Sequence, residues 1–136
     1  MDKVIITELD RHIFMETIKN NNGLFIVKFT ATWCGPCKKI APFVDEQFKN
    51  TPDIVTCANI DVDRNFDLFA FLKSSKVRVP FLRFLKSKKM VKGVPVILAY
   101  KKENTNYSPD FSVSGTNEEQ LIVFFRNCVN YIKTIQ

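Results

Sequence analysis

Residues 30–43 read TATWCGPCKKIAPF, a stretch in which only a Gly-Pro dipeptide separates Cys34 from Cys37. A near-continuous apolar run, LFIVKFTA at 24–31, precedes it and is typical of a central strand that is buried on both faces. Apolar residues at helical spacing follow it over 38–50. The two cysteines therefore lie where a buried strand passes into a helix. Such a pair can be a redox couple, half of a metal site, or simply the start of a helix.

The rest of the chain alternates between strand-like and helical patterns. Strands are expected over 4–9, 24–31, 54–62, 94–100 and 111–115, and helices over 11–20, 38–50, parts of 66–92, and from the capping-box pattern TNEE at 116–119 onward. A strand, a helix and a strand joined by a short return imply a right-handed parallel unit. The sequence predicts an α/β fold with the order β-α-β-α-β-α-β-β-α, and the length of 136 residues suits one domain over 1–136.

Four stretches of the chain resemble the thioredoxin family. They are FTATWCGPCKKIAPF at 29–43, NID at 59–61, KGVPVILAYKKE at 92–103 and SGTNEEQL at 114–121. The resemblance covers nearly the whole chain, and WCGPCK is its most specific motif. It implies the thioredoxin fold, in which helices flank a central mixed β-sheet, and it implies thiol-disulfide oxidoreductase activity.

The resemblance also implies that Cys34 and Cys37 form a redox-active disulfide, with no cofactor and no metal. The chemistry of the residues agrees. Cys34 is expected at an exposed helix N-terminus, where unpaired N–H groups and the helix dipole favour a thiolate that can attack a substrate disulfide. Cys37, one turn into the helix, would be the resolving thiol. Gly35 and Pro36 restrict the turn, so that the two Cα atoms can approach the roughly 4.4–6.8 Å that a disulfide requires.

The family binds its substrate chain in a shallow apolar groove beside the disulfide. Carried over position by position, the expected substrate-binding residues are Trp33, Gly35, Pro36, Gly93, Val94 and Pro95.

The family also has a cis-proline that faces the disulfide, and this chain offers two candidates. Pro80 is followed by a helical pattern, as expected for the first residue of a helix. Pro95 is followed by a strand pattern and preceded by Lys-Gly, as in the family, so Val94-Pro95 is expected to be cis and packed over the disulfide. The stretch from 61 to 95 is then longer than the family pattern. We expect an insertion at about 79–91 that forms one extra helix.

Two alternatives to a redox pair remain at the CxxC motif. A zinc site would need two more ligands, and only Cys57, Cys128 and His12 are available, all in predicted regular elements and without a second CxxC. The other alternative is a CxxC that only packs. Cys57 and Cys128 themselves are expected to behave as small buried apolar residues.

The first ten residues, MDKVIITELD, contain acids and no long apolar run, so we expect neither a secretory signal nor a membrane span. Without an export signal, the four cysteines are better explained by reduced thiols with one reactive pair than by a disulfide framework. We therefore expect a cytoplasmic protein.

Positive charge is concentrated in one part of the chain. No acidic residue occurs over 68–102, whereas that segment holds ten of the twenty lysines and arginines, from Lys73 to Lys102. The chain's formal net charge of +6 is therefore local. This basic segment could steer an acidic partner to the redox site, or it could be an ordinary solvated face.

Lys28 is a charged residue in the middle of the buried strand, six residues before Cys34. The family usually has a buried acid at the matching position, which accepts the proton of the resolving thiol, and Cys57 stands at the position of a nearby lysine. We expect Lys28 either to reach water with its ammonium or to stay beneath the site. A buried Lys28 would act as a catalytic residue, either as a neutral amine that takes the proton from Cys37 or as a cation that stabilises thiolates.

The resemblance and the residues together predict a thiol-disulfide oxidoreductase of electron transport, with Cys34, Cys37 and Lys28 as candidate catalytic residues. Expected partners are protein disulfide substrates and a thiol electron donor such as a thioredoxin reductase. The alternative is a thioredoxin-fold binding or assembly module whose basic insertion engages an acidic partner.

Overall fold

The computed structural model describes residues 3–74, 76–77, 88–89 and 93–136. Its elements are β1 (Ile5–Ile6), α1 (Arg11–Lys19), β2 (Leu24–Thr30), α2 (Gly35–Lys49), β3 (Val55–Asp61), α3 (Phe66–Ser74), β4 (Lys76–Val77), β5 (Lys88–Lys89), β6 (Val96–Lys101), β7 (Phe111–Ser114) and α4 (Glu118–Ile135).

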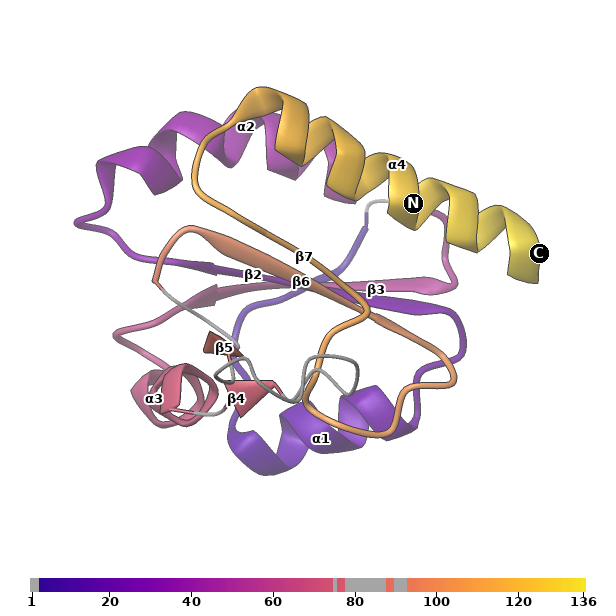
Figure 1. Cartoon of the computed structure of the whole chain (residues 1–136), viewed down its shortest axis with the longest axis horizontal. Helices are drawn as coiled ribbons and strands as arrows, with labels where there is room; N and C mark the ends of the chain where they lie inside the picture. The colour runs from indigo at the N-terminus through magenta and orange to yellow at the C-terminus, as the bar shows by residue number, and fades with distance from the viewer. Residues whose placement is uncertain (1–2, 75, 78–87, 90–92) are drawn as a thin grey trace.

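Five strands form one mixed sheet in the order β1-β3-β2-β6-β7. β1, β3 and β2 are parallel, whereas β6 runs antiparallel to β2 and β7 antiparallel to β6. Helices α2 and α4 cover one face of this sheet, and α1 and α3 cover the other (Figure 1). This arrangement confirms the α/β class and the mixed sheet flanked by helices that the sequence predicts.

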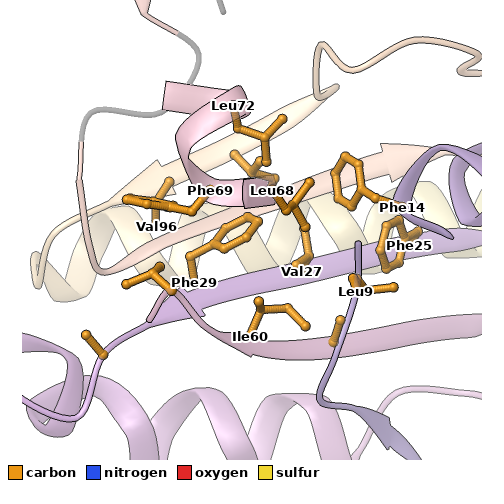
Figure 2. Close-up of a cluster of buried hydrophobic side chains, with 14 of the residues drawn as sticks. Leu9, Phe14, Phe25, Val27, Phe29, Ile60, Leu68, Phe69, Leu72 and Val96 are labelled. Atoms are coloured by element: carbon orange, nitrogen blue, oxygen red, sulfur yellow. The ribbon is translucent and has the colours of Figure 1, made fainter. Parts of the chain in front are cut away.

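β2 is the central strand, because β3 and β6 flank it on either side. Its side chains alternate between two hydrophobic clusters. Phe25, Val27 and Phe29 point into the cluster on the side of α1 and α3, where they meet aromatic and aliphatic side chains of both helices (Figure 2). Leu24 and Ile26 belong to the second cluster, on the side of α2 and α4. Lys28 follows them on this second face by the same alternation.

The strand β1 is shorter than the predicted 4–9 and comprises only Ile5 and Ile6. The chain leaves the sheet after them, and the Leu9 N–H donates instead to Asn65 Oδ1 at 3.0 Å. The last helix starts as predicted near 116–119, but its N-cap is Asn117, whose Oδ1 accepts from the Gln120 N–H at 3.0 Å.

The expected insertion at 79–91 is only partly within the described residues. Lys88 and Lys89 form β5, which pairs antiparallel with Lys76 and Val77 of β4. These two lysines are therefore in a strand, and the extra helix predicted over the insertion does not include them. Pro80 and the other insertion residues lie outside the described part of the chain. Among the helices that the structure describes, none is long and apolar enough to cross a membrane.

Candidate active site

The CGPC sequence forms the first turn of α2. Cys34 is the N-cap, and Gly35 and Pro36 are the first residues of the helix, where the missing N–H of a proline costs no helical hydrogen bond. The Cys37 N–H donates a hydrogen bond to Cys34 Sγ at 3.1 Å. A disulfide joins the two cysteines, whose Cα atoms are 5.3 Å apart. The sulfur of Cys34 thus caps the helix in the way that a Ser or Asp oxygen usually does.

Both cysteines are buried, and this corrects the prediction of an exposed Cys34. Cys34 is 4% and Cys37 is 2% exposed. The reason is that both belong to the cluster on the α1 and α3 side, together with Ala31, Val62 and Val96. Gly35 and Pro36, which lie between the two cysteines, are by contrast exposed.

The indole of Trp33 lies next to the disulfide in sequence and is 67% exposed. Its Nε1–H donates to Asp63 Oδ2 at 2.8 Å, and the Asp63 N–H in turn donates to Asp61 Oδ1 at 2.8 Å. The hydrogen bond holds an apolar ring at the surface in one orientation. Asp63 is not among the residues predicted from the sequence, although its place two residues after the NID stretch could have indicated it.

The Val94-Pro95 peptide bond is cis, as predicted from the sequence. The Pro95 carbonyl accepts a hydrogen bond from the Gly115 N–H at 3.0 Å, which ties this turn to the end of β7. Val94 is half-buried and packs against the cluster that contains Cys34 and Cys37. The turn at 93–95 is therefore on the same side of the sheet as the disulfide. Pro80, the other candidate for the cis-proline, lies outside the described residues.

Lys28 is buried. The sequence left open whether its ammonium reaches water or stays inside the protein, and the structure has the side chain inside. Its side chain is 3% exposed, and its Nζ lies 3.8 Å from Oδ1 of Asp45, a residue of α2 with a side chain 63% exposed. Burial lowers the pKa of Lys28 from 10.5, while the charge of Asp45 acts in the opposite direction. Asp45 is not among the residues predicted from the sequence, because nothing in a local pattern relates it to a strand residue seventeen positions earlier.

The other two cysteines are free and buried in the second cluster. Burial raises the pKa of Cys57, and burial together with the neighbouring Cys57 raises the pKa of Cys128 to about 12. Both thiols are therefore protonated and unreactive at neutral pH. Over the residues that the structure describes, no three His, Cys, Asp or Glu side chains are grouped so as to hold a metal ion.

Comparison with known proteins gives one consistent result. The family model for thioredoxin matches residues 5–127. Among curated proteins, an H-type thioredoxin of Ricinus communis is 41% identical over an alignment of 69 residues that covers 43% of this chain and 58% of that protein. A thioredoxin of Geodia cydonium is 39% identical over 78 residues, which are 56% of this chain and 70% of that protein. The chain thus matches a little over half the length of the first of these relatives.

The solved structures agree with the fold. A thioredoxin of Trichomonas vaginalis superposes with a TM-score of 0.67 at 20% identity, over 93% of this chain and 98% of that one. A thioredoxin of Plasmodium falciparum gives 0.63 at 24% identity, over 90% and 98%. At these identities the superpositions establish the thioredoxin fold, and the family model, which spans most of the sequence, establishes membership. The chain belongs to the thioredoxin family.

Proposed function

We propose that this protein is a thiol-disulfide oxidoreductase that cycles Cys34 and Cys37 between dithiol and disulfide. The observation that carries the proposal is the disulfide at the first turn of α2, with Cys34 Sγ accepting the Cys37 N–H. A thiolate at Cys34 would keep this hydrogen bond and gain from the helix dipole. Membership of the thioredoxin family supports the same activity.

The proposed reaction transfers two electrons in two displacement steps. The Cys34 thiolate attacks one sulfur of a substrate disulfide, which forms a mixed disulfide and releases the other substrate sulfur as a thiolate that takes up a proton. Cys37 then loses its proton and attacks Cys34 Sγ. The Cys34–Cys37 bond forms, the mixed disulfide breaks, and the second substrate thiol leaves. The substrate is reduced and the protein is oxidised.

The substrate chain would lie against the exposed end of the site. Trp33 offers an apolar ring, Gly35 and Pro36 are exposed at the helix start, and the turn at Gly93, Val94 and Pro95 would form the opposite wall. Lys28 would act on the ionisation of the thiols from within the core.

The protein would draw its electrons from a thioredoxin-reductase-like or other thiol donor. One relative, of Mycobacterium leprae, is named a bifunctional thioredoxin reductase/thioredoxin, and this chain matches 13% of it. We further propose that residues 1–136 form a single domain that acts in the cytoplasm as part of electron transport.

A second candidate function rests on the basic segment. Ten lysines and arginines with no acid over 68–102 would suit an acidic partner, and in that case the protein would be a binding or assembly module. The CGPC pair would then be residual or regulatory.

Reduction of insulin by dithiothreitol, followed as turbidity, separates the two functions. Catalysed precipitation that is lost in Cys34→Ser supports the oxidoreductase. No acceleration by protein in which Cys34 and Cys37 titrate as a normal dithiol would contradict it and favour the module.

A further inference from the structure

Lys28 lies on the face of the sheet that α2 and α4 cover, in a layer of mostly apolar side chains. On its face of the sheet, Leu24 and Ile26 precede it on β2. Its neighbours across the ladders are Asn59 on β3 and Ile97 on β6. The buried residues of α2 over this face are Ile40, Val44 and Phe48, whereas Cys37, at the start of the helix, belongs to the other cluster. A cation here loses its hydration and needs a fixed partner of opposite charge.

The titratable groups that face this layer are few. β3 contributes the free thiol of Cys57, α4 contributes Cys128 and Tyr131, and all three have a pKa raised by burial. They are therefore neutral at physiological pH. Asp45 on α2 is the carboxylate that an ion pair joins to Lys28 within the described residues.

Asn59 adds a second feature that favours a positive charge. Its Oδ1 is buried and has no hydrogen-bond partner within the described part of the chain. Because Asn59 is the register partner of Lys28 in a parallel pair, the two side chains emerge on the same face. An unpaired amide oxygen places the negative end of a dipole in the same layer.

We propose that Asp45 is a positioning residue of the redox site, which keeps the buried Lys28 in its ammonium form. Lys28 is then a fixed cation beneath the disulfide-bearing helix, rather than a neutral amine that accepts the proton of Cys37. This inference rests on the proposed redox cycle only in that Cys34 and Cys37 must interconvert between dithiol and disulfide.

The distances explain why Asp45 acts through Lys28. Asp45 lies eight positions after Cys37 along α2, a rise of about 12 Å, and its side chain is largely exposed. At that separation solvent and salt weaken the direct effect of the carboxylate on the sulfurs, since the screening length is about 8 Å at physiological ionic strength. The ammonium is buried, so its charge is screened less. A cation in this position stabilises thiolates and therefore the reduced form.

The first test is a direct titration of Lys28 by NMR of its Nζ and Cε, in wild type, Asp45→Asn and Glu46→Gln. Glu46 is the matched control, because it is the next residue on α2, is also exposed, and hydrogen-bonds the Asn50 side chain instead of Lys28. Both substitutions are on the surface and should leave the fold intact. We expect the pKa of Lys28 to fall in Asp45→Asn and to stay in place in Glu46→Gln. An equal effect of the two variants, or none, would overturn the proposal.

The second test links the charge to the redox pair through equilibrium with glutathione. Replacing Lys28 by Met should change the equilibrium constant about tenfold in favour of the disulfide, which corresponds to a potential more negative by about 30 mV. This difference should persist with rising pH only while Lys28 is charged. The same difference in equilibrium constant is then measured between Asp45→Asn and the Asp45→Asn/Lys28→Met double variant. It should vanish at a lower pH there than between wild type and Lys28→Met.

The difference in equilibrium constant between Glu46→Gln and the Glu46→Gln/Lys28→Met double variant should vanish at the same pH as the difference between wild type and Lys28→Met. If the difference vanishes at the same pH in all three pairs, or is absent at every pH, Asp45 does not control the site through Lys28. A protein that passes this test but fails to reduce insulin would contradict the proposed function and leave the inference about Asp45 standing.

Discussion

The backbone N–H of Cys37 donates to the sulfur of Cys34 at 3.1 Å, although the two sulfurs are already joined by a disulfide. The same N–H is in place to stabilise a negative charge on Cys34 Sγ once the bond is reduced. Hydrogen bonds to an ionised acceptor are about twice as strong as those between neutral groups. The helix start is therefore arranged for the reduced, ionised state of Cys34.

This relationship predicts that the reduced protein has a Cys34 pKa below the ~8.5 of a free cysteine. Titration of the thiolate by its ultraviolet absorbance, with the rate of alkylation by iodoacetamide as a second measure, checks it. The thiolate absorbance and the alkylation rate should both rise with pH around the same low pKa, and this rise should be absent in Cys34→Ser. A first ionisation at the free-cysteine value would mean that neither the helix nor Lys28 acts on this sulfur.

The two cysteines should give different phenotypes when replaced singly. Cys34→Ser removes the attacking sulfur and should abolish disulfide reduction. Cys37→Ser leaves the attack intact but removes the resolving thiol, so mixed disulfides with substrates should accumulate. Non-reducing gels and mass spectrometry of the trapped species read this out. Trapping by Cys34→Ser instead would assign the opposite roles.

The hydrogen bond between Trp33 and Asp63 should matter for binding more than for stability. A hydrogen bond contributes a net free energy of about 1 kcal/mol. Asp63→Ala should therefore raise KM for a protein disulfide by up to about fivefold and leave kcat nearly unchanged. Asp63→Asn keeps an acceptor oxygen and is the control. Equal kinetics of Asp63→Ala and wild type would mean that the hydrogen bond that holds the Trp33 indole does not contribute to substrate binding.

The buried ammonium of Lys28 should cost stability in a pH-dependent way. Its pKa is lowered in the folded protein from 10.5, so between the folded value and 10.5 the unfolded chain binds more protons. Stability therefore rises with pH across that alkaline window, and the cost is fully present below it. Lys28→Met should be more stable than wild type by about 1 kcal/mol or more at pH 7.

Urea unfolding of both proteins at several pH values measures this cost. The advantage of Lys28→Met should shrink as the pH approaches 10.5. A difference that is constant with pH, or a methionine variant that is less stable at pH 7, would indicate that Lys28 carries no penalty for its charge.

Much of the fold follows from local sequence patterns. The apolar run at 24–31 predicts the central strand β2 because a strand buried on both faces needs apolar residues at nearly every position. The cis bond before Pro95 follows from the strand pattern after it and the resemblance to the family. By contrast, β1 ends early because Leu9 bonds to the side chain of Asn65, a contact between residues far apart in the sequence.

The site was less predictable than the fold. CGPC identifies the disulfide, but the partners that adjust it lie elsewhere: Asp63 follows β3, and Asp45 lies about two turns after Cys37 on α2. The burial of Cys34 also depends on tertiary packing against a cluster built from several elements. Lys28 could be singled out from the sequence, whereas its counter-ion could not, because the reach of a long side chain is decided by the helix that packs on it.

The measurement that tests the account most directly is the equilibrium of the protein with glutathione buffers of graded potential, read by counting thiols and by mass spectrometry of alkylated peptides. We predict a single two-electron transition in which Cys34 and Cys37 convert together, while Cys57 and Cys128 stay reduced throughout. A pair that shows no transition across the range, or a transition that involves Cys57 or Cys128 in place of Cys34 and Cys37, would contradict the proposed redox cycle.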